Sequence, residues 1–259
     1  EEDVSTDNIL SQTLRRPFIP QKFIGIEEFK INTVKEWPSN FSTSLGFSRT
    51  EYDPFFPLPS RSHFNEKDNY HFIGSEMMLR FRYAPGERKI STRRKVIRIK
   101  NNEPIYEFRI NKGIKGFVDG NYDYLKMHAA ISQKIRIPSW GTLNYNAYAG
   151  KIIGDSLPFM FLELHPGNEV YIYNRNGFNL MNRFEYYSDQ YAGFQVEHNF
   201  ERKLIQYIPL LNKTKIRQFW TLKGVWGQMT NSNRIFNRTE LGSYQLRTLR
   251  SHTYLEYGT

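Results

Sequence analysis

The sequence predicts an all-β protein of long antiparallel strands, and the form it favours is a transmembrane β-barrel with a loop folded into the lumen. Alternation of apolar and polar residues recurs along the chain, most clearly from 122 to 137. Aromatic residues make up 16% of the chain, which favours strands over helices. Turn residues such as Pro138 and Gly141 separate the alternating stretches, as expected for an antiparallel all-β protein.

The stretch from 122 to 137 shows what two-residue periodicity implies. Successive side chains of a strand point to opposite faces, so this stretch has one apolar and one basic-polar face. Lys126, His128 and Ser132 fall on the basic-polar face, which is expected to line the lumen. A later stretch, 216–226, has the same pattern. The residues expected to face lipid on these two stretches are Leu125, Met127, Ala129, Ile131, Ile135, Trp220 and Leu222.

Alternation alone fits both a membrane barrel and a soluble sandwich or barrel. The length of the strands distinguishes between these two architectures. Strands in soluble domains average about five or six residues, whereas about 9–11 tilted residues span a bilayer. The alternating stretches are long, and aromatic residues such as Tyr83, Tyr122, Tyr124 and Trp226 lie near their ends. Both features favour the membrane barrel. The low mean hydropathy of -0.63 does not exclude it, because alternating strands average out to polar.

Composition narrows the chemistry. The absence of cysteine excludes disulfides and thiolate metal sites. A net charge of +10 fits nucleic acid, anionic lipid or a cationic lumen as partner. The basic run from 88 to 100 could bind nucleic acid, but a loop that meets anionic lipid headgroups is the favoured interpretation. No signal peptide is visible at Glu1, so the chain is cytosolic or already trimmed.

The predicted organisation is a connecting or lumen segment, 1–22, followed by a barrel domain, 23–259. Within that domain, 155–182 is the long loop expected in the lumen. Its first apolar run is interrupted by Pro158, which cannot donate to a strand ladder. Tyr171, Tyr173 and Phe178 have no strand face to join, so we expect them to be shielded inside the barrel.

Catalytic and metal sites are not expected. Ser188, Asp189 and His198 have the residue types of a hydrolytic triad, but no glycine elbow surrounds them and strand geometry would scatter their side chains. The histidines lack the spacing of zinc ligands. We therefore expect a non-enzymatic protein without a metal or other cofactor.

A set of short segments carries a resemblance to a known family. They are 82–87, 112–116, 157–158, Gly167, Asn168, Phe178, Asn179, Leu180, Met181, Asn182, Glu185, Ser188, Asp189, His198, 209–211, Arg217 and 254–258. Together they resemble the Bacteroidota outer-membrane proteins of unassigned function in which a carboxypeptidase-regulatory-like domain precedes a β-barrel. The resemblance implies an outer-membrane location, strands that continue beyond Thr259 and a domain before the barrel, so this chain is expected to be part of a longer protein. One departure is Glu201-Arg202-Lys203, which stands where the family has a glycine-containing turn.

The family's barrel is in turn similar in outline to BamA-like surface-antigen barrels, which insert or translocate polypeptides. Their inward loop carries an Arg-Gly-Phe/Tyr motif, which Arg175-Asn176-Gly177-Phe178 approximates with one extra residue. This resemblance implies that Arg175 finds an acidic partner on the barrel wall. It also implies a component of polypeptide insertion or export, or of another outer-membrane complex. Its expected partners are outer-membrane lipids and other outer-membrane or lipoprotein subunits, with no nucleic acid. The alternatives are a passive pore or small-solute transporter, and a soluble basic β domain that binds nucleic acid.

Overall fold

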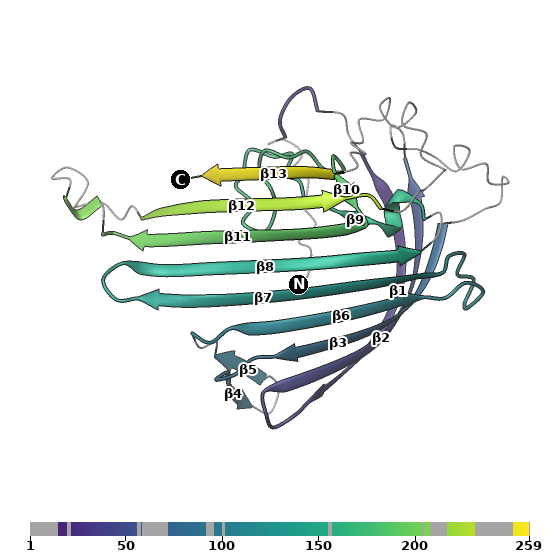
Figure 1. The fold of residues 1–259 in the computed structure, drawn as a ribbon, viewed down its shortest axis with the longest axis horizontal. Helices are drawn as coiled ribbons and strands as arrows, with labels where there is room; N and C mark the ends of the chain where they lie inside the picture. The colour runs from purple at the N-terminus through teal and green to yellow at the C-terminus, as the bar shows by residue number, and fades with distance from the viewer. Residues whose placement is uncertain are drawn as a thin grey trace.

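A computed structural model describes residues 15–19, 22–55, 58, 72–91, 96–99, 102–154, 157–203, 205–207, 217–230 and 251–258. One nine-stranded sheet dominates this part of the chain (Figure 1). Every pair of neighbouring strands in it is antiparallel. The predicted all-β class is therefore confirmed.

The strands of the sheet follow one another in chain order, with no crossover. Two short hairpins, β4–β5 and β9–β10, branch off between them, and the 3₁₀ turns η2 (Phe159–Phe161) and η3 (Ile205–Tyr207) are the helical pieces among the described residues. The elements of the main sheet are β1 (Ile24–Glu36), β2 (Phe41–Pro54), β3 (Phe72–Tyr83), β6 (Ile105–Gly113), β7 (Tyr124–Ile137), β8 (Gly141–Gly154), β11 (Gln190–Glu201), β12 (Gln218–Gln228) and β13 (Ser251–Gly258).

The basic run from 88 to 100 differs from its prediction as a loop. In its described part, β4 (Arg88–Ser91) pairs antiparallel with β5 (Val96–Ile99) in a hairpin between β3 and β6. Ile90 lies opposite Ile97 in this ladder. The β-branched residues among the basic ones favour a strand, and the count of charges concealed that signal.

The longest hairpin, β7–β8, has the register that the alternation predicts. Ile131 lies opposite Ala147, and Ser132 lies opposite Asn146. The turn between the strands includes Ser139 and Gly141, both with positive φ. Apolar residues therefore continue across the sheet on one face and polar residues on the other.

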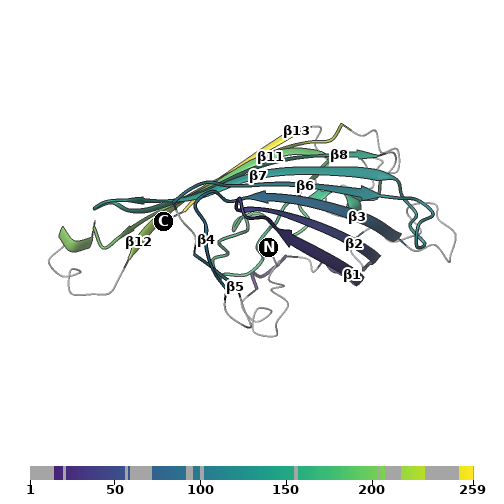
Figure 2. The same cartoon turned by 90° about the horizontal axis from the view of Figure 1, so that it is seen from below.

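The sheet is curved, and the two faces differ in what they carry. Figure 2 shows it arching over the segment that connects β8 to β11. We call the face toward this segment the concave face; its residues include Glu76, Arg80, Lys126 and Glu197. Packing of the Phe161 ring against Tyr124, with centroids 5.4 Å apart, fixes which side is concave.

The opposite, convex face is apolar through its middle. Cross-strand register places every second residue there, and many large apolar side chains on it are exposed. Aromatic rings gather at one end of this face, where Tyr83 stacks on Tyr106 and Phe41 on Phe81. Exposed apolar side chains of this face include Phe29, Ile31, Leu45, Met77, Phe108, Phe194, Trp220, Leu222 and Leu255.

Within the described residues, β1 and β13 each pair with one strand only, so the sheet has two edges there. No helix in this part of the chain is long and apolar enough to cross a membrane.

Candidate functional site

The most distinctive feature of the concave face is a long segment folded onto it, residues 157–189, which we call the plug segment. It leaves the sheet after β8 and returns to it at β11, so it is longer than the predicted loop, 155–182. The end of the segment pairs back onto its start, because β10 (Tyr187–Ser188) lies antiparallel to β9 (Glu163–Leu164). Two residues of pairing leave too short a pattern to identify in sequence.

An aromatic cluster anchors the start of the plug segment. Phe159 and Phe161, on η2, are completely buried. The Phe161 ring packs edge-on against Tyr52 of β2 and obliquely against Tyr124 of β7. The segment thereby bridges strands that are far apart in the sheet. The buried members of this cluster are Leu58, Phe72, Tyr124, Ile152, Leu157, Phe159, Met160, Phe161, Leu162 and Tyr187.

A glycine admits one of the large rings beside this cluster. The Tyr191 ring of β11 lies over Gly150 of β8, where an added Cβ would come within 2.4 Å of the ring. The Tyr191 hydroxyl is 3.0 Å from Nδ1 of His128, and its ring meets His165 of the plug segment edge-on. Rings on the wall and in the plug segment therefore form one packed unit.

Asn168 organises the middle of the plug segment. Its backbone N–H donates to the carbonyl oxygens of Phe178 and Met181, at 3.0 and 2.9 Å. Its side-chain amide donates to the Ile172 carbonyl and to Oδ1 of Asn179. Asn168 thus closes the loop from 168 to 181 onto itself, which explains why an asparagine stands there.

The tip of the plug segment, 174–180, is fixed to the wall by charged side chains. Arg175, for which the resemblance implies an acidic partner, forms an ion pair with Glu197 of β11. Lys223 of β12 donates to the carbonyl oxygens of Asn174 and Gly177, at 3.0 and 2.6 Å. Glu256 of β13 also bonds to the tip, so the neighbouring strands β11, β12 and β13 all hold it in place.

Glu256 is the acceptor on β13. Its carboxylate is 5% exposed and accepts from Nδ2 of Asn179 at 3.2 Å and from the Leu180 N–H at 3.0 Å. Phe178 and Met181 fill the space between these bonds and pack with Val225 of β12. The tip is held by a buried apolar contact with polar bonds on either side.

Glu256→Ala is expected to lower the free energy of unfolding by about 1–3 kcal/mol, because it leaves the Leu180 N–H without its acceptor and removes one of the acceptors of the Asn179 amide. Equilibrium denaturant titration measures the change. Glu27→Ala, on the exposed strand β1, is the control and is expected to stay within about 0.5 kcal/mol of the parent. Equal losses for the two variants would contradict the role of Glu256.

The expected shielding of the plug aromatics is correct only at Phe178, which is completely buried. Tyr171 is 68% exposed, and Tyr173 and Leu180 are exposed as well. Tyr173 is nevertheless close to the wall, 4.8 Å from the Lys223 ammonium.

The N-terminal segment, predicted as 1–22, contacts the plug segment in its described part. Arg15 pairs with Glu169 at 2.9 Å, and Arg16 bonds to the Asn168 carbonyl. Lys22 is buried nearby, and burial lowers the pKa of its ammonium, although Glu169 and Glu185 act in the opposite direction. Residues 1–14, 20 and 21 lie outside the described residues.

The remaining plug-segment residues singled out from the sequence have structural partners. Asn182 donates its backbone N–H to Glu185 at 2.9 Å. Gly167 forms an isolated bridge with Phe178. These two contacts and those of Asn168 gather the residues of 167–185 that carry the resemblance into one compact loop.

The candidate triad does not assemble. Ser188 shares a hydrogen bond of 2.9 Å with His165, while Asp189 accepts from the backbone N–H and hydroxyl of Thr230. His198 lies on the convex face and stacks on Phe200, with ring centroids 4.1 Å apart. The Ser188 hydroxyl and His165 are both buried, which leaves no approach for a substrate carbonyl.

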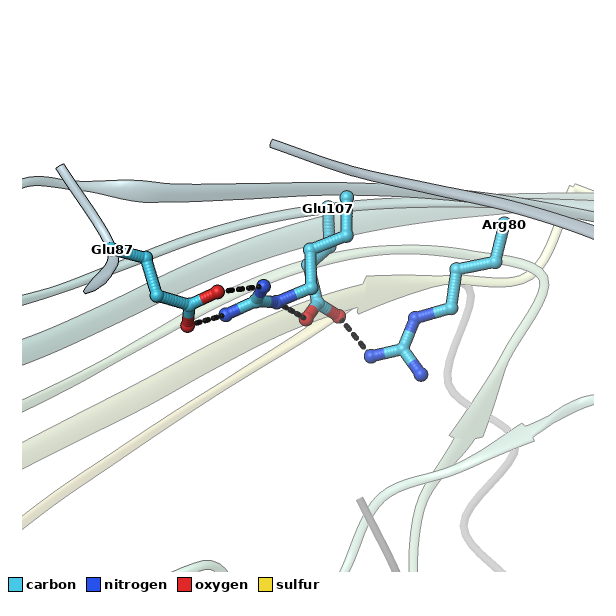
Figure 3. A network of polar contacts seen from close by, with 4 residues as sticks. Arg80, Glu87 and Glu107 are labelled. Carbon is cyan, nitrogen blue, oxygen red and sulfur yellow. Dashed lines mark hydrogen bonds and ion pairs between the residues drawn. The ribbon is translucent and has the colours of Figure 1, made fainter. Parts of the chain in front are cut away.

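Charged side chains of the concave face form a network at the end of β3 that lies away from the plug-segment cluster (Figure 3). Arg82 holds Glu87 through two bonds of 3.0 and 2.8 Å. Glu107 lies between Arg82, at 3.7 Å, and Arg80, at 2.7 Å. Nearer the plug segment, Glu76 accepts from three side chains, those of Asn111, Tyr124 and Lys126.

The residues predicted to face lipid all lie on the convex face. Leu125, Met127, Ala129, Ile131 and Ile135 share a face of β7 opposite Lys126, whose ammonium bonds to Glu76 on the concave side. Trp220 and Leu222 share the corresponding face of β12. Among the described residues, no group of three or more acidic or histidine side chains is placed to hold a metal ion.

Sequence reasoning did not identify Glu197, Lys223 and Glu256 as partners of the plug segment. The sequence shows only that each of the three occupies a polar position in an alternating strand. Which loop meets them depends on long-range packing, which periodicity does not encode.

A comparison with protein families identifies the family of this chain. Residues 39–233 match the model of the C-terminal domain of a family of unknown function, DUF5686. No match was found among curated proteins. Since the match covers more than half of the sequence, the chain belongs to the DUF5686 family.

Proposed function

We propose that this chain forms most of a transmembrane β-barrel in a Bacteroidota-type outer membrane. The observation that carries the proposal is the division of one curved sheet into an exposed apolar face and a polar, ion-paired face. In water, such an apolar face would be unfavourable; in a bilayer, it would meet hydrocarbon. Strands β1, β2, β7 and β8 have 13 to 14 residues, enough to cross with tilt.

Aromatic residues near the strand ends support this orientation. Trp37, Tyr83, Tyr106, Trp140 and Trp220 are exposed at one end of the sheet, near the hairpins β1–β2 and β7–β8. Such amphipathic rings prefer the headgroup region of a membrane. A band of them at one level is typical of outer-membrane barrels.

Within this proposal, the protein is a non-enzymatic component of polypeptide insertion or export, or of another outer-membrane complex. Support comes from the plug segment, which is attached to the wall through Arg175 and Glu197, and from the resemblance to BamA-like barrels. Outer-membrane lipids and other outer-membrane or lipoprotein subunits are the proposed partners.

The plug segment argues against a passive pore, because its aromatic cluster fills one end of the concave face. A soluble nucleic-acid-binding domain fits less well, since the apolar convex face would be left in water.

Detergent dependence tests the membrane proposal. The protein is expected to stay in the membrane fraction without detergent, to become monodisperse in detergent and to shift in gel mobility on heating. A monodisperse protein in plain buffer would overturn the proposal. Copurification from native membranes then identifies the partners; recovery of the protein alone would count against membership of a complex.

A further inference from the structure

We propose that Arg80 and Arg109 form a binding site for a tetrahedral oxyanion, a phosphate or phosphate monoester, on the concave face. The two residues lie directly opposite each other on β3 and β6. Directly opposite residues in an antiparallel pair have Cα atoms about 4.5–5.5 Å apart, so two guanidinium groups share one small area. Like charges in this position are unfavourable unless something compensates them.

Compensation is incomplete among the described residues. Arg80 bonds to Glu107 at 2.7 Å through one terminal nitrogen, and its other terminal nitrogen points away from the network (Figure 3). Glu107 also interacts with Arg82, and Arg82 forms a second ion pair with Glu87. Glu36 also acts on Arg82, so three carboxylates act on Arg82, and one of them, Glu107, bonds to Arg80.

Arg109 is the group left over. No described carboxylate lies within 4.0 Å of it, and its side chain is exposed. Its neighbour on β7 is His128, whose Nδ1 is 3.0 Å from the Tyr191 hydroxyl, so this neighbour supplies no negative charge. Arg109 therefore places beside Arg80 a second guanidinium that forms no ion pair with a described carboxylate.

The geometry favours a tetrahedral oxyanion over a carboxylate. Each guanidinium presents a planar fork of N–H donors. A carboxylate has two oxygens and satisfies one fork, whereas a phosphate has enough oxygens to accept from Arg80 and Arg109 together. The plug-segment cluster, built around Phe72 and Tyr124, lies at the other end of β3 and β7, and the Arg109 side chain is exposed.

Inorganic phosphate is the probe for the test, at constant ionic strength with chloride as background. Phosphorus NMR of phosphate titrated with purified protein measures the dissociation constant. The protein is kept in detergent if the membrane proposal holds and in plain buffer if it fails, so the two proposals are tested separately. Because the site is built from the sheet alone, it requires no particular cellular location.

Arg109→Gln is expected to weaken phosphate binding at least about tenfold, as loss of a charge-assisted bond should. The matched control is Arg136→Gln, also on the concave face of β7 and exposed, which removes the same charge about 26 Å along the strand from the His128 position. Its binding is expected to stay within about twofold of the parent. Arg109→Lys keeps the charge but not the fork, so its affinity should fall between the two.

Three outcomes would overturn the site: no binding to the parent protein at millimolar phosphate, equal binding by Arg109→Gln and the parent, or equal weakening by Arg136→Gln. Circular dichroism checks folding of every variant. Because Arg109 has no described acidic partner, Arg109→Gln is expected to fold at least as well as the parent without phosphate. A variant that failed to fold would show that Arg109 is already compensated, and this too would refute the proposal.

Discussion

Ile131→Arg is expected to destabilise the protein in lipid vesicles by about 2–4 kcal/mol, the cost of an arginine at the midplane of a barrel's lipid face. Ile131 lies near the middle of β7 on the convex face, between Tyr106 of β6 and Ala147 of β8. Equilibrium denaturant titration of the protein folded into vesicles measures the loss.

Ser132→Arg is the matched control, because the adjacent position points to the concave face. Its cross-strand neighbours are Asn146 of β8 and Ile105 of β6. We expect a much smaller loss there, with some repulsion from Lys134 on the same face. Equal losses, or a larger loss for Ser132→Arg, would mean that the convex face does not meet lipid.

Gly167→Ala is expected to cost about 3 kcal/mol, at the upper end of what overpacking does. A Cβ at this position would lie 2.2 Å from the Asn182 carbonyl oxygen and 2.4 Å from its carbonyl carbon. Backbone atoms cannot move aside as a flexible side chain can, so the loop that Asn168 organises would have to open. Denaturant titration gives the loss.

Gly177→Ala, in the same segment, is the graded control for this clash. There an added Cβ would come no closer than 3.1 Å, to the Asn174 amide and the Pro166 carbonyl oxygen. The expected cost is about 1 kcal/mol. If Gly177→Ala proved as damaging as Gly167→Ala, the close packing of Gly167 against Asn182 would not be the cause.

Periodicity predicted the strands well because it follows directly from backbone geometry. The face assignment of β7 could be derived from alternation alone, and the register with β8 follows from the short turn at Gly141. The β4–β5 hairpin was missed because its pattern is short and charged. A short, charged stretch of this kind becomes a strand only because it pairs with another strand. That pairing cannot be predicted from the periodicity of the sequence.

The position of the plug segment in the chain could be predicted from its sequence, but its folded structure could not. Pro158 and the lack of a period indicated an irregular segment, and the structure places a 3₁₀ turn there. The pairing of Ser188 with His165 joins residues 23 positions apart through two-residue strands, which leave no periodic trace. The exposure of Tyr171 could not be derived either, because aromatic character gives no direction to a side chain outside a strand.

Strict alternation of strand direction in the main sheet has a consequence for how the sheet can close on itself. Counting along the order from β1 to β13, the first and ninth strands run the same way. Joined directly, they would form a parallel pair, which is slightly less stable per residue than an antiparallel one. Continuous antiparallel closure therefore requires an odd number of strands between β13 and β1, and one is the smallest number that gives the even total usual in bacterial barrels.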